Sequence, residues 1–171
     1  MVRVLFVCLG NICRSPTAEG VFLSMVREAG LEEAVEAESA GTGAYHVGGG
    51  ADPRSVRAAR RRGYDLSRHC ARQVRADDFG KFDYVLAMDR DNLRDLQSLC
   101  SEHVSRISRS TAQHERPPLA RVAMLLDFAP QLTVREVPDP YARADDGFDF
   151  VIDIVEDAAR GLLEHILANP A

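Results

Sequence analysis

The feature that most constrains the fold of this chain is a mostly apolar run, Val2 to Val7, that ends directly at Cys8 and leads through a short loop to Ser15 and Pro16. A run this rich in β-branched residues is typical of a strand buried on both faces of a parallel sheet. Ser15 is a favourable helix cap, and Pro16 suits the first position of a helix. The sequence therefore predicts a strand, a loop and a helix in immediate succession.

Cys8 and Arg14 stand at the two ends of this loop, separated by five residues. Backbone N–H groups between a strand and a helix can converge on one tetrahedral anion. Arg14 offers a planar fork of donors that fits two phosphate oxygens, which a lysine cannot reproduce. The helix dipole favours a thiolate at Cys8, and Ser15 can donate a hydroxyl hydrogen bond to it. The pattern predicts phosphoryl transfer to sulfur.

Gly10 and Asn11 are the loop residues that most readily accept a positive φ, which a tightly curled anion-binding loop requires. The Asn11 amide can then brace the loop. The alternative is that Cys8 is a small buried apolar residue and Arg14 a solvated surface residue. Strand, glycine, asparagine, Ser-Pro and helix in this order favour the catalytic interpretation.

Asp139 is the candidate acid, because departure of a phenol benefits from a proton delivered as the bond breaks. Pro138 and Pro140 flank it and stiffen the loop around one carboxylate. Asp139 can protonate the leaving oxygen and then activate water against a phosphocysteine. Taken alone, it is more simply a turn aspartate between prolines; the loop from Cys8 to Arg14 favours the catalytic role.

Length and composition predict one domain over residues 1–171, since 46% of the residues are hydrophobic. Four scattered cysteines, with no leader segment and no long apolar span, favour a reducing cytoplasm without membrane insertion. The net charge of −5 argues against a nucleic-acid partner. We interpret Arg60 to Arg62 as a solvated helix end. Cysteine and histidine show no paired metal-ligand spacing.

Strand-like and helical patterns alternate along the chain, which predicts an α/β fold with a parallel sheet covered by helices on both faces. Further strands are expected at 35–39, 84–88 and 121–125, although leucines also allow a helix after 121. Helices are expected at 16–29, from Asp52 and Pro53 onward, at 91–99, and in a closing segment whose apolar residues form one buried stripe: Phe148, Val151, Ile152, Val155, Ala159, Leu162, Leu163 and Ile166. The polar stretch 101–118 is expected to be a surface excursion.

With these motifs in place, the chain resembles the low-molecular-weight protein-tyrosine phosphatases over nearly its whole length. Further matching segments, in the family's order, are 38–42, 51–54, 71–73 and 86–89. The resemblance implies a single-domain three-layer sandwich with a four-stranded parallel sheet, and a mechanism that needs no metal or other cofactor. It also implies that Cys8 is the nucleophile, Arg14 the phosphate clamp and Asp139 the general acid.

The same resemblance implies roles for the residues around these three. Asn11, Ser15 and His69 match the positions that hold the phosphate loop in shape, although His69 alone would be interpreted as a surface histidine. The expected phosphate-binding positions are Leu9, Gly10, Asn11, Ile12, Cys13 and Ser15.

The walls of the slot and its redox chemistry form a second set of expectations. Tyr45 and Tyr141 are expected to form apolar walls against which a phenyl ring can stack, rather than being ordinary loop aromatics. Cys13 can form a protective disulfide with Cys8 under peroxide, or can simply pack beneath the loop. Cys70 and Cys100 are expected to be spectators.

The expected substrate is a phosphotyrosine-bearing protein or a small aryl phosphate, and the chain is expected to be a monomer or weak homodimer. Ile12 favours an aryl ester as the substrate. In the arginine phosphatases that the chain also resembles, the corresponding position is polar, typically threonine. An arsenate reductase would need a cysteine pair that Cys70 and Cys100 do not supply. A noncatalytic phosphotyrosine-binding module would be expected to lack Cys8 or Asp139. Ala142 departs from the family, whose members often have a second aromatic at this position.

Overall fold

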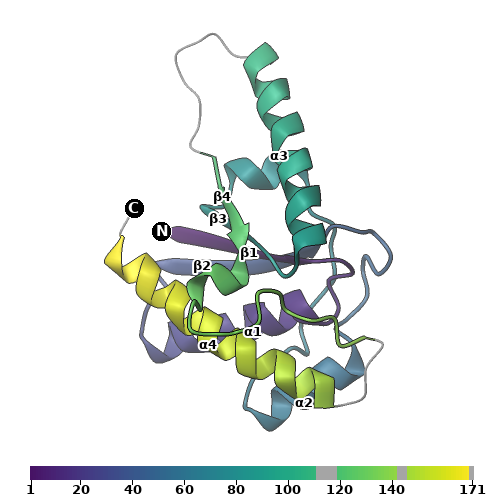
Figure 1. The fold of residues 1–171 in the computed structure, drawn as a ribbon, viewed down its shortest axis with the longest axis vertical. Helices are drawn as coiled ribbons and strands as arrows, with labels where there is room; N and C mark the ends of the chain where they lie inside the picture. Colours follow the sequence, from purple (N-terminus) through teal and green to yellow (C-terminus); the bar gives the residue numbers. More distant parts are fainter. Residues whose placement is uncertain (111–118, 142–145, 170–171) are drawn as a thin grey trace.

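The computed structural model describes residues 1–110, 119–141 and 146–169. In these ranges a parallel sheet has the strand order β2-β1-β3-β4. Figure 1 shows α1, α2 and α4 on one side of this sheet and α3 on the other. The elements are β1 (Val2–Cys8), α1 (Arg14–Glu28), β2 (Val35–Gly41), α2 (Pro53–Arg61), η1 (Ala76–Gly80), β3 (Tyr84–Ala87), α3 (Arg90–Ser110), β4 (Arg121–Met124), η2 (Leu125–Phe128) and α4 (Asp146–Ala168).

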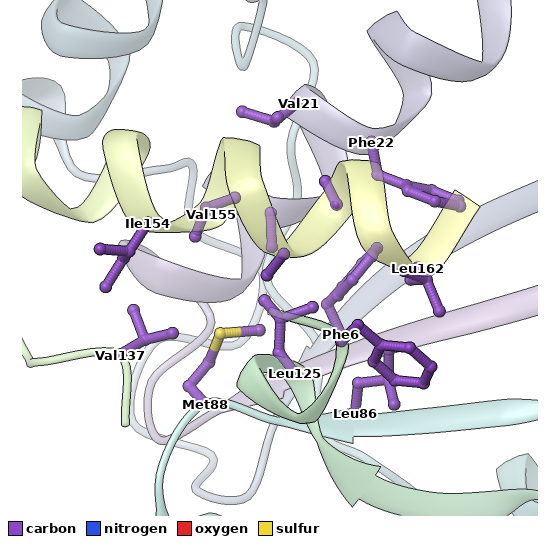
Figure 2. Packing of buried hydrophobic residues seen from close by; sticks show 14 of the residues in the cluster. Phe6, Val21, Phe22, Leu86, Met88, Leu125, Val137, Ile154, Val155 and Leu162 are labelled. Atoms are coloured by element: carbon purple, nitrogen blue, oxygen red, sulfur yellow. The ribbon is translucent and has the colours of Figure 1, made fainter. Parts of the chain in front are cut away.

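The central strand β1 contributes side chains to two separate cores, which explains its nearly continuous apolar sequence. Val4 and Phe6 join the core beneath α1 and α4, whereas Leu5 joins the core beneath α3. Figure 2 shows the first core, where side chains of α4 point toward those of β1 and β3. Phe6 packs edge-on against Phe22 of α1, with ring centroids 5.6 Å apart. Burial on both faces fixes β1 and therefore the loop that follows it.

The α/β fold with a four-stranded parallel sheet and helices on both faces is confirmed. The predicted buried stripe of α4 is also confirmed, because all eight of its residues are buried. Asp52 caps α2 and Pro53 is its first residue, as expected. Within the described residues, no helix is both long enough and apolar enough to cross a bilayer.

The predicted start of the first helix is wrong. The helix α1 begins at Arg14, so Ser15 and Pro16 lie within its first turn, and no side chain caps it. The physical reason is that the Ser15 hydroxyl lies 3.0 Å from Cys8 Sγ. A hydroxyl turned toward the loop is not available to cap the helix.

The expected surface excursion at 101–118 is wrong for its first part, because α3 continues to Ser110. Leu96 and His103 are buried on one face of this helix, and Leu93, Leu99 and Cys100 pack against the second core. These spacings of three and four residues extend the helix past the polar residues on its outer face. Residues 111–118 and Ala142 lie outside the described ranges.

The segment after β3 and the arginine run also differ in detail from expectation. The sequence allowed a strand or a helix from residue 121 onward, and both are present, because the strand β4 is followed by the 3-10 helix η2. Arg61 and Arg62 are not simply solvated: Arg61 pairs with Asp149 at 2.8 Å and Arg62 with Asp153 at 2.5 Å, both on α4. The arginine run therefore joins α2 to α4.

Gly161 allows the backbones of α4 and η2 to approach closely, because a Cβ at this position would lie 1.9 Å from the carbonyl oxygen of Phe128. We predict that Gly161→Ala lowers the free energy of unfolding by about 2 kcal/mol, because overpacking costs more than the gain in helix propensity. Urea unfolding measures the change. Glu164→Ala on the exposed face of α4 is the control, and equal stability of both variants would contradict the prediction.

Candidate active site

The loop of residues 8–14 lies at the carboxyl end of β1 beside a cavity of about 170 Å³. Open parallel sheets commonly bind ligands at this edge. The cavity is lined by nine residues that the sequence singled out and by His46, which it did not: Cys8, Leu9, Gly10, Ile12, Cys13, Arg14, Tyr45, His46, Asp139 and Tyr141. Asn11, Ser15 and His69 stand behind the loop rather than in the cavity lining.

Cys8 is 3% exposed and its sulfur lies within a set of donors. The Asn11 backbone N–H donates to Sγ at 3.3 Å, and Ser15 Oγ lies 3.0 Å from it. The Asn11 N–H and the N-terminus of α1 favour negative charge on sulfur, and the Ser15 hydroxyl does so when it donates to Sγ rather than to the Ala40 carbonyl, which lies 3.3 Å from it. The geometry suits a nucleophilic thiolate.

Asn11 adopts a φ of 55°, whereas Gly10 does not adopt a positive φ. The Asn11 amide nitrogen donates to Ser15 Oγ and to Ser39 Oγ, both at 2.9 Å. Its amide oxygen accepts from the Arg72 backbone N–H at 2.9 Å, and its carbonyl oxygen lies 2.6 Å from His69 Nε2. The predicted brace is therefore present, with two partners, Ser39 and Arg72, that the sequence analysis missed.

Ser39 continues this network toward α1. Its hydroxyl donates to Glu19 Oε2 at 2.6 Å, and burial raises the pKa of the Glu19 carboxyl above its usual value. The position of Ser39 follows from strand pairing, since β2 pairs with β1 so that Ser39 lies beside Phe6. A serine near the carboxyl end of the neighbouring strand was the available signal.

Arg14 is 3% exposed and is held by three oxygen atoms. One terminal nitrogen donates to Asp89 Oδ2 at 2.5 Å and to the Val137 carbonyl at 3.2 Å, and the other donates to Asp139 Oδ2 at 3.4 Å. Burial alone would lower the pKa of the guanidinium, but the charges of Cys8 and these carboxylates raise it above its usual value. The side chain is a fixed cation beside the thiol. Asp89, which helps to hold it, is a partner for which the sequence predicts no role.

Asp139 lies at the mouth of the cavity, with a side chain that is 48% exposed. Its Oδ1 accepts from the Tyr141 backbone N–H at 3.0 Å. Tyr141 and Tyr45 are 53% and 77% exposed, so their rings stand at the rim rather than deep in the slot. His46 lies over the loop, since a Cβ on Gly10 would be 3.0 Å from its ring. The rim can contact an aromatic substrate.

Cys13 is buried, and all four cysteines are free thiols. Burial raises the pKa of the Cys13 thiol to about 12. Cys70 is exposed and Cys100 is half-buried. Within the described residues, no group of three or more His, Cys, Asp or Glu side chains could hold a metal ion.

The conformation of Asn11 generates a prediction about stability. Asn11→Ala should lower the free energy of unfolding by about 3 kcal/mol, because buried partners lose their hydrogen bonds. Asn11→Gly should be more stable than Asn11→Ala by about 1 kcal/mol, because glycine accepts the left-handed conformation. Urea unfolding compares the two; equal stability would show that the positive φ is not a constraint.

The raised pKa of Cys13 generates a prediction about reactivity. Native protein treated with iodoacetamide at pH 7.5 should leave Cys13 unmodified, because a protonated, buried thiol is a poor nucleophile. Peptide mapping by mass spectrometry measures the modification, with exposed Cys70 as the internal control. Labelling of Cys13 as fast as Cys70 would contradict the burial argument.

Comparison with known proteins agrees with this geometry. The family described as low molecular weight phosphotyrosine protein phosphatase matches residues 3–170. A low molecular weight protein-tyrosine-phosphatase of Streptomyces coelicolor is 44% identical over 163 residues, covering 94% of this chain and 91% of its own. The human low molecular weight phosphotyrosine protein phosphatase is 38% identical over 161 residues, covering 94% and 93%.

Solved structures give the same result. The crystal structure of a protein tyrosine phosphatase from Entamoeba histolytica superposes with a TM-score of 0.85 and 37% identity, covering 100% of both chains. YfkJ of Bacillus subtilis superposes with a TM-score of 0.84 and 33% identity, covering 100% of this chain and 98% of that one. On the family match, the relatives and the fold together, this chain belongs to the low molecular weight protein-tyrosine phosphatase family.

Proposed function

We propose that this protein hydrolyses phosphotyrosine on proteins, or small aryl phosphates, in two steps through a phosphocysteine on Cys8. The observation that supports this most strongly is the set of donors around one sulfur: the Asn11 N–H, the Ser15 hydroxyl and the Arg14 guanidinium beside them. A phosphate in the loop would be bound by backbone N–H groups and by a fixed cation in place of water.

In the first step, the Cys8 thiolate attacks phosphorus. The S–P bond forms, the bond from phosphorus to the phenolic oxygen breaks, and the Asp139 carboxyl gives its proton to that oxygen. Asp89 and the Val137 carbonyl hold one nitrogen of Arg14, so its remaining donors can face two phosphate oxygens. Because Asp139 lies at the cavity mouth, its carboxyl can reach an oxygen that leaves toward solvent.

In the second step, the Asp139 carboxylate takes a proton from a water molecule that attacks phosphorus. The S–P bond breaks, inorganic phosphate is released, and the Cys8 thiolate is restored with Asp139 protonated for the next cycle. Ser15 and the Asn11 N–H stabilise the sulfur as a leaving group, because both donate to its negative charge. The residues required lie within this chain.

The slot favours an aryl ester. Tyr45 and Tyr141 line the cavity at its rim, where their rings can contact a phenyl group, and Ile12 adds apolar surface to the lining. A tyrosine side chain carries its phosphate further from the peptide backbone than serine does, so it can reach the loop from the rim. Leu9, Gly10 and Cys13 complete the phosphate-binding loop of this proposal.

We also propose that Cys13 protects Cys8 from overoxidation. Peroxide converts the Cys8 thiolate to a sulfenic acid, and the Cys13 thiol then attacks that sulfur to form a disulfide with loss of water. The Cys13 thiol loses its proton as its sulfur attacks, and that proton leaves with the hydroxide as water. The raised pKa of this thiol slows the step, so the proposal relies on the nearness of two cysteines in one short loop. We also propose that the protein works in a reducing compartment such as the cytoplasm, because four scattered cysteines do not form the disulfide framework that is typical of secreted domains.

The test is hydrolysis of a phosphotyrosine peptide beside matched phosphoserine and phosphoarginine peptides, with EDTA present. The wild-type protein should turn over phosphotyrosine alone. Cys8→Ser should abolish turnover, and Asp139→Asn should slow it by about a hundredfold or more, as is typical for loss of a general acid.

Three outcomes would contradict this function. Preference for phosphoarginine would move the protein to a different substrate class. Tight binding of phosphotyrosine without turnover would make it a recognition module. Retained turnover in Cys8→Ser would exclude the phosphocysteine.

A further inference from the structure

Arg54, in the first turn of α2, contacts aromatic rings from two segments that are far from it in the sequence. Its guanidinium carbon lies 5.3 Å from the ring centroid of Tyr141 and 4.8 Å from that of Phe148. Both distances are within the range of a cation–π interaction. Phe148 belongs to the start of α4, and Tyr141 belongs to the loop that carries Asp139. Arg54 therefore lies between the acid loop and the helix that follows it.

Asp52 fixes the orientation of the Arg54 side chain. Its two carboxylate oxygens accept from Arg54 Nε at 3.1 Å and from a terminal nitrogen at 2.9 Å. The Asp52 backbone N–H donates to the Ile12 carbonyl at 2.8 Å, and Asp52 is 8% exposed. Arg54 is thereby positioned relative to the phosphate loop.

Tyr141 connects this arrangement to the candidate acid. Its backbone N–H donates to Asp139 Oδ1 at 3.0 Å, while the other carboxylate oxygen faces Arg14. A displaced Tyr141 would carry that donor away and release one side of the Asp139 carboxylate. Small displacements of a catalytic group are costly, because proton transfer depends on hydrogen-bond geometry.

We propose that Arg54 is a positioning residue for the general acid, acting through Tyr141 on Asp139. The proposal rests on the proposed role of Asp139 as the acid that protonates the leaving phenol. Arg54 does not touch the reacting atoms; it sets the position of the acid loop against the phosphate loop. An arginine suits this place because it can stack on rings while it pairs with a carboxylate through two nitrogens.

The experiment compares kcat/KM for phosphotyrosine and for 2,4-dinitrophenyl phosphate. Dinitrophenolate departs as a stable anion without a proton, so loss of acid positioning affects it little. The variants are Arg54→Met, Arg54→Lys, Asp139→Asn and the double variant Arg54→Met/Asp139→Asn. Arg57→Met, an exposed arginine one turn further along α2, is the matched control.

We expect Arg54→Met to lower kcat/KM for phosphotyrosine by about tenfold, a fraction of what a general acid contributes, with less than about a twofold change for dinitrophenyl phosphate. Arg54→Lys, which keeps a cation beside the rings, should fall between wild type and Arg54→Met. The double variant should be no slower than Asp139→Asn alone, because Arg54 acts through Asp139. Arg57→Met should match wild type.

Equal losses on both substrates would mean a general structural effect and would overturn the proposal. So would multiplicative losses in the double variant, unchanged kinetics in Arg54→Met, or equal losses in Arg54→Lys and Arg54→Met. A failure of the acid assignment itself is separately visible, because Asp139→Asn would then show no difference between the two substrates.

Discussion

The shape of the site depends on one residue, Asn11, whose backbone and side-chain polar groups all have hydrogen-bond partners. Asn11 occupies the left-handed region, which turns the loop so that its own N–H points back at Cys8. Such a conformation is unfavourable for most residues with a side chain, although asparagine tolerates it better than others, and here it is maintained by partners from α1, β2 and the segment 69–72. The sheet and its flanking helices place those partners, so the fold itself holds the loop in the shape that we propose binds an anion.

The parts of the fold and site that could be predicted are those whose signal is local. The strand β1 is mostly apolar because it is buried on both faces, and that property is visible in six of its seven residues, Arg3 being the exception. Cys8 and Arg14 stand at the two ends of one short loop, and their spacing together with the strand, glycine, asparagine, Ser-Pro and helix around them indicated the chemistry that we propose. The flanking prolines of Asp139 are by themselves typical of a turn, and it was the loop from Cys8 to Arg14 that favoured this carboxylate as the acid. The family resemblance then supplied His69, Tyr45 and Tyr141.

The missed features arise from contacts between distant segments. Ser39, Asp89 and Arg72 are polar residues near the carboxyl ends of strands or in a loop, and nothing local separates them from solvated residues. Their roles follow from the register of parallel strands and from the packing of loops at one sheet edge. The prediction that Ser15 caps the helix is wrong because its hydroxyl lies against Cys8 Sγ and accepts from the Asn11 amide. The sequence analysis allowed the contact with Cys8, but helix propensity does not weigh such a contact against capping. The length of α3 was also missed, because the residues on its outer face are polar. The extent of the helix follows only from the residues on its other face that contact the core.

The most direct test of the central claim is to trap the intermediate. Wild-type protein mixed with a phosphotyrosine peptide is quenched in acid within one turnover, digested and mapped by mass spectrometry. The account predicts a phosphoryl group on the peptide that contains Cys8, with its amount equal to the tyrosine peptide released in the first turnover. Release of that product with no phosphoryl group on Cys8, or with the group on another residue, would contradict a loop built to transfer phosphate to this sulfur.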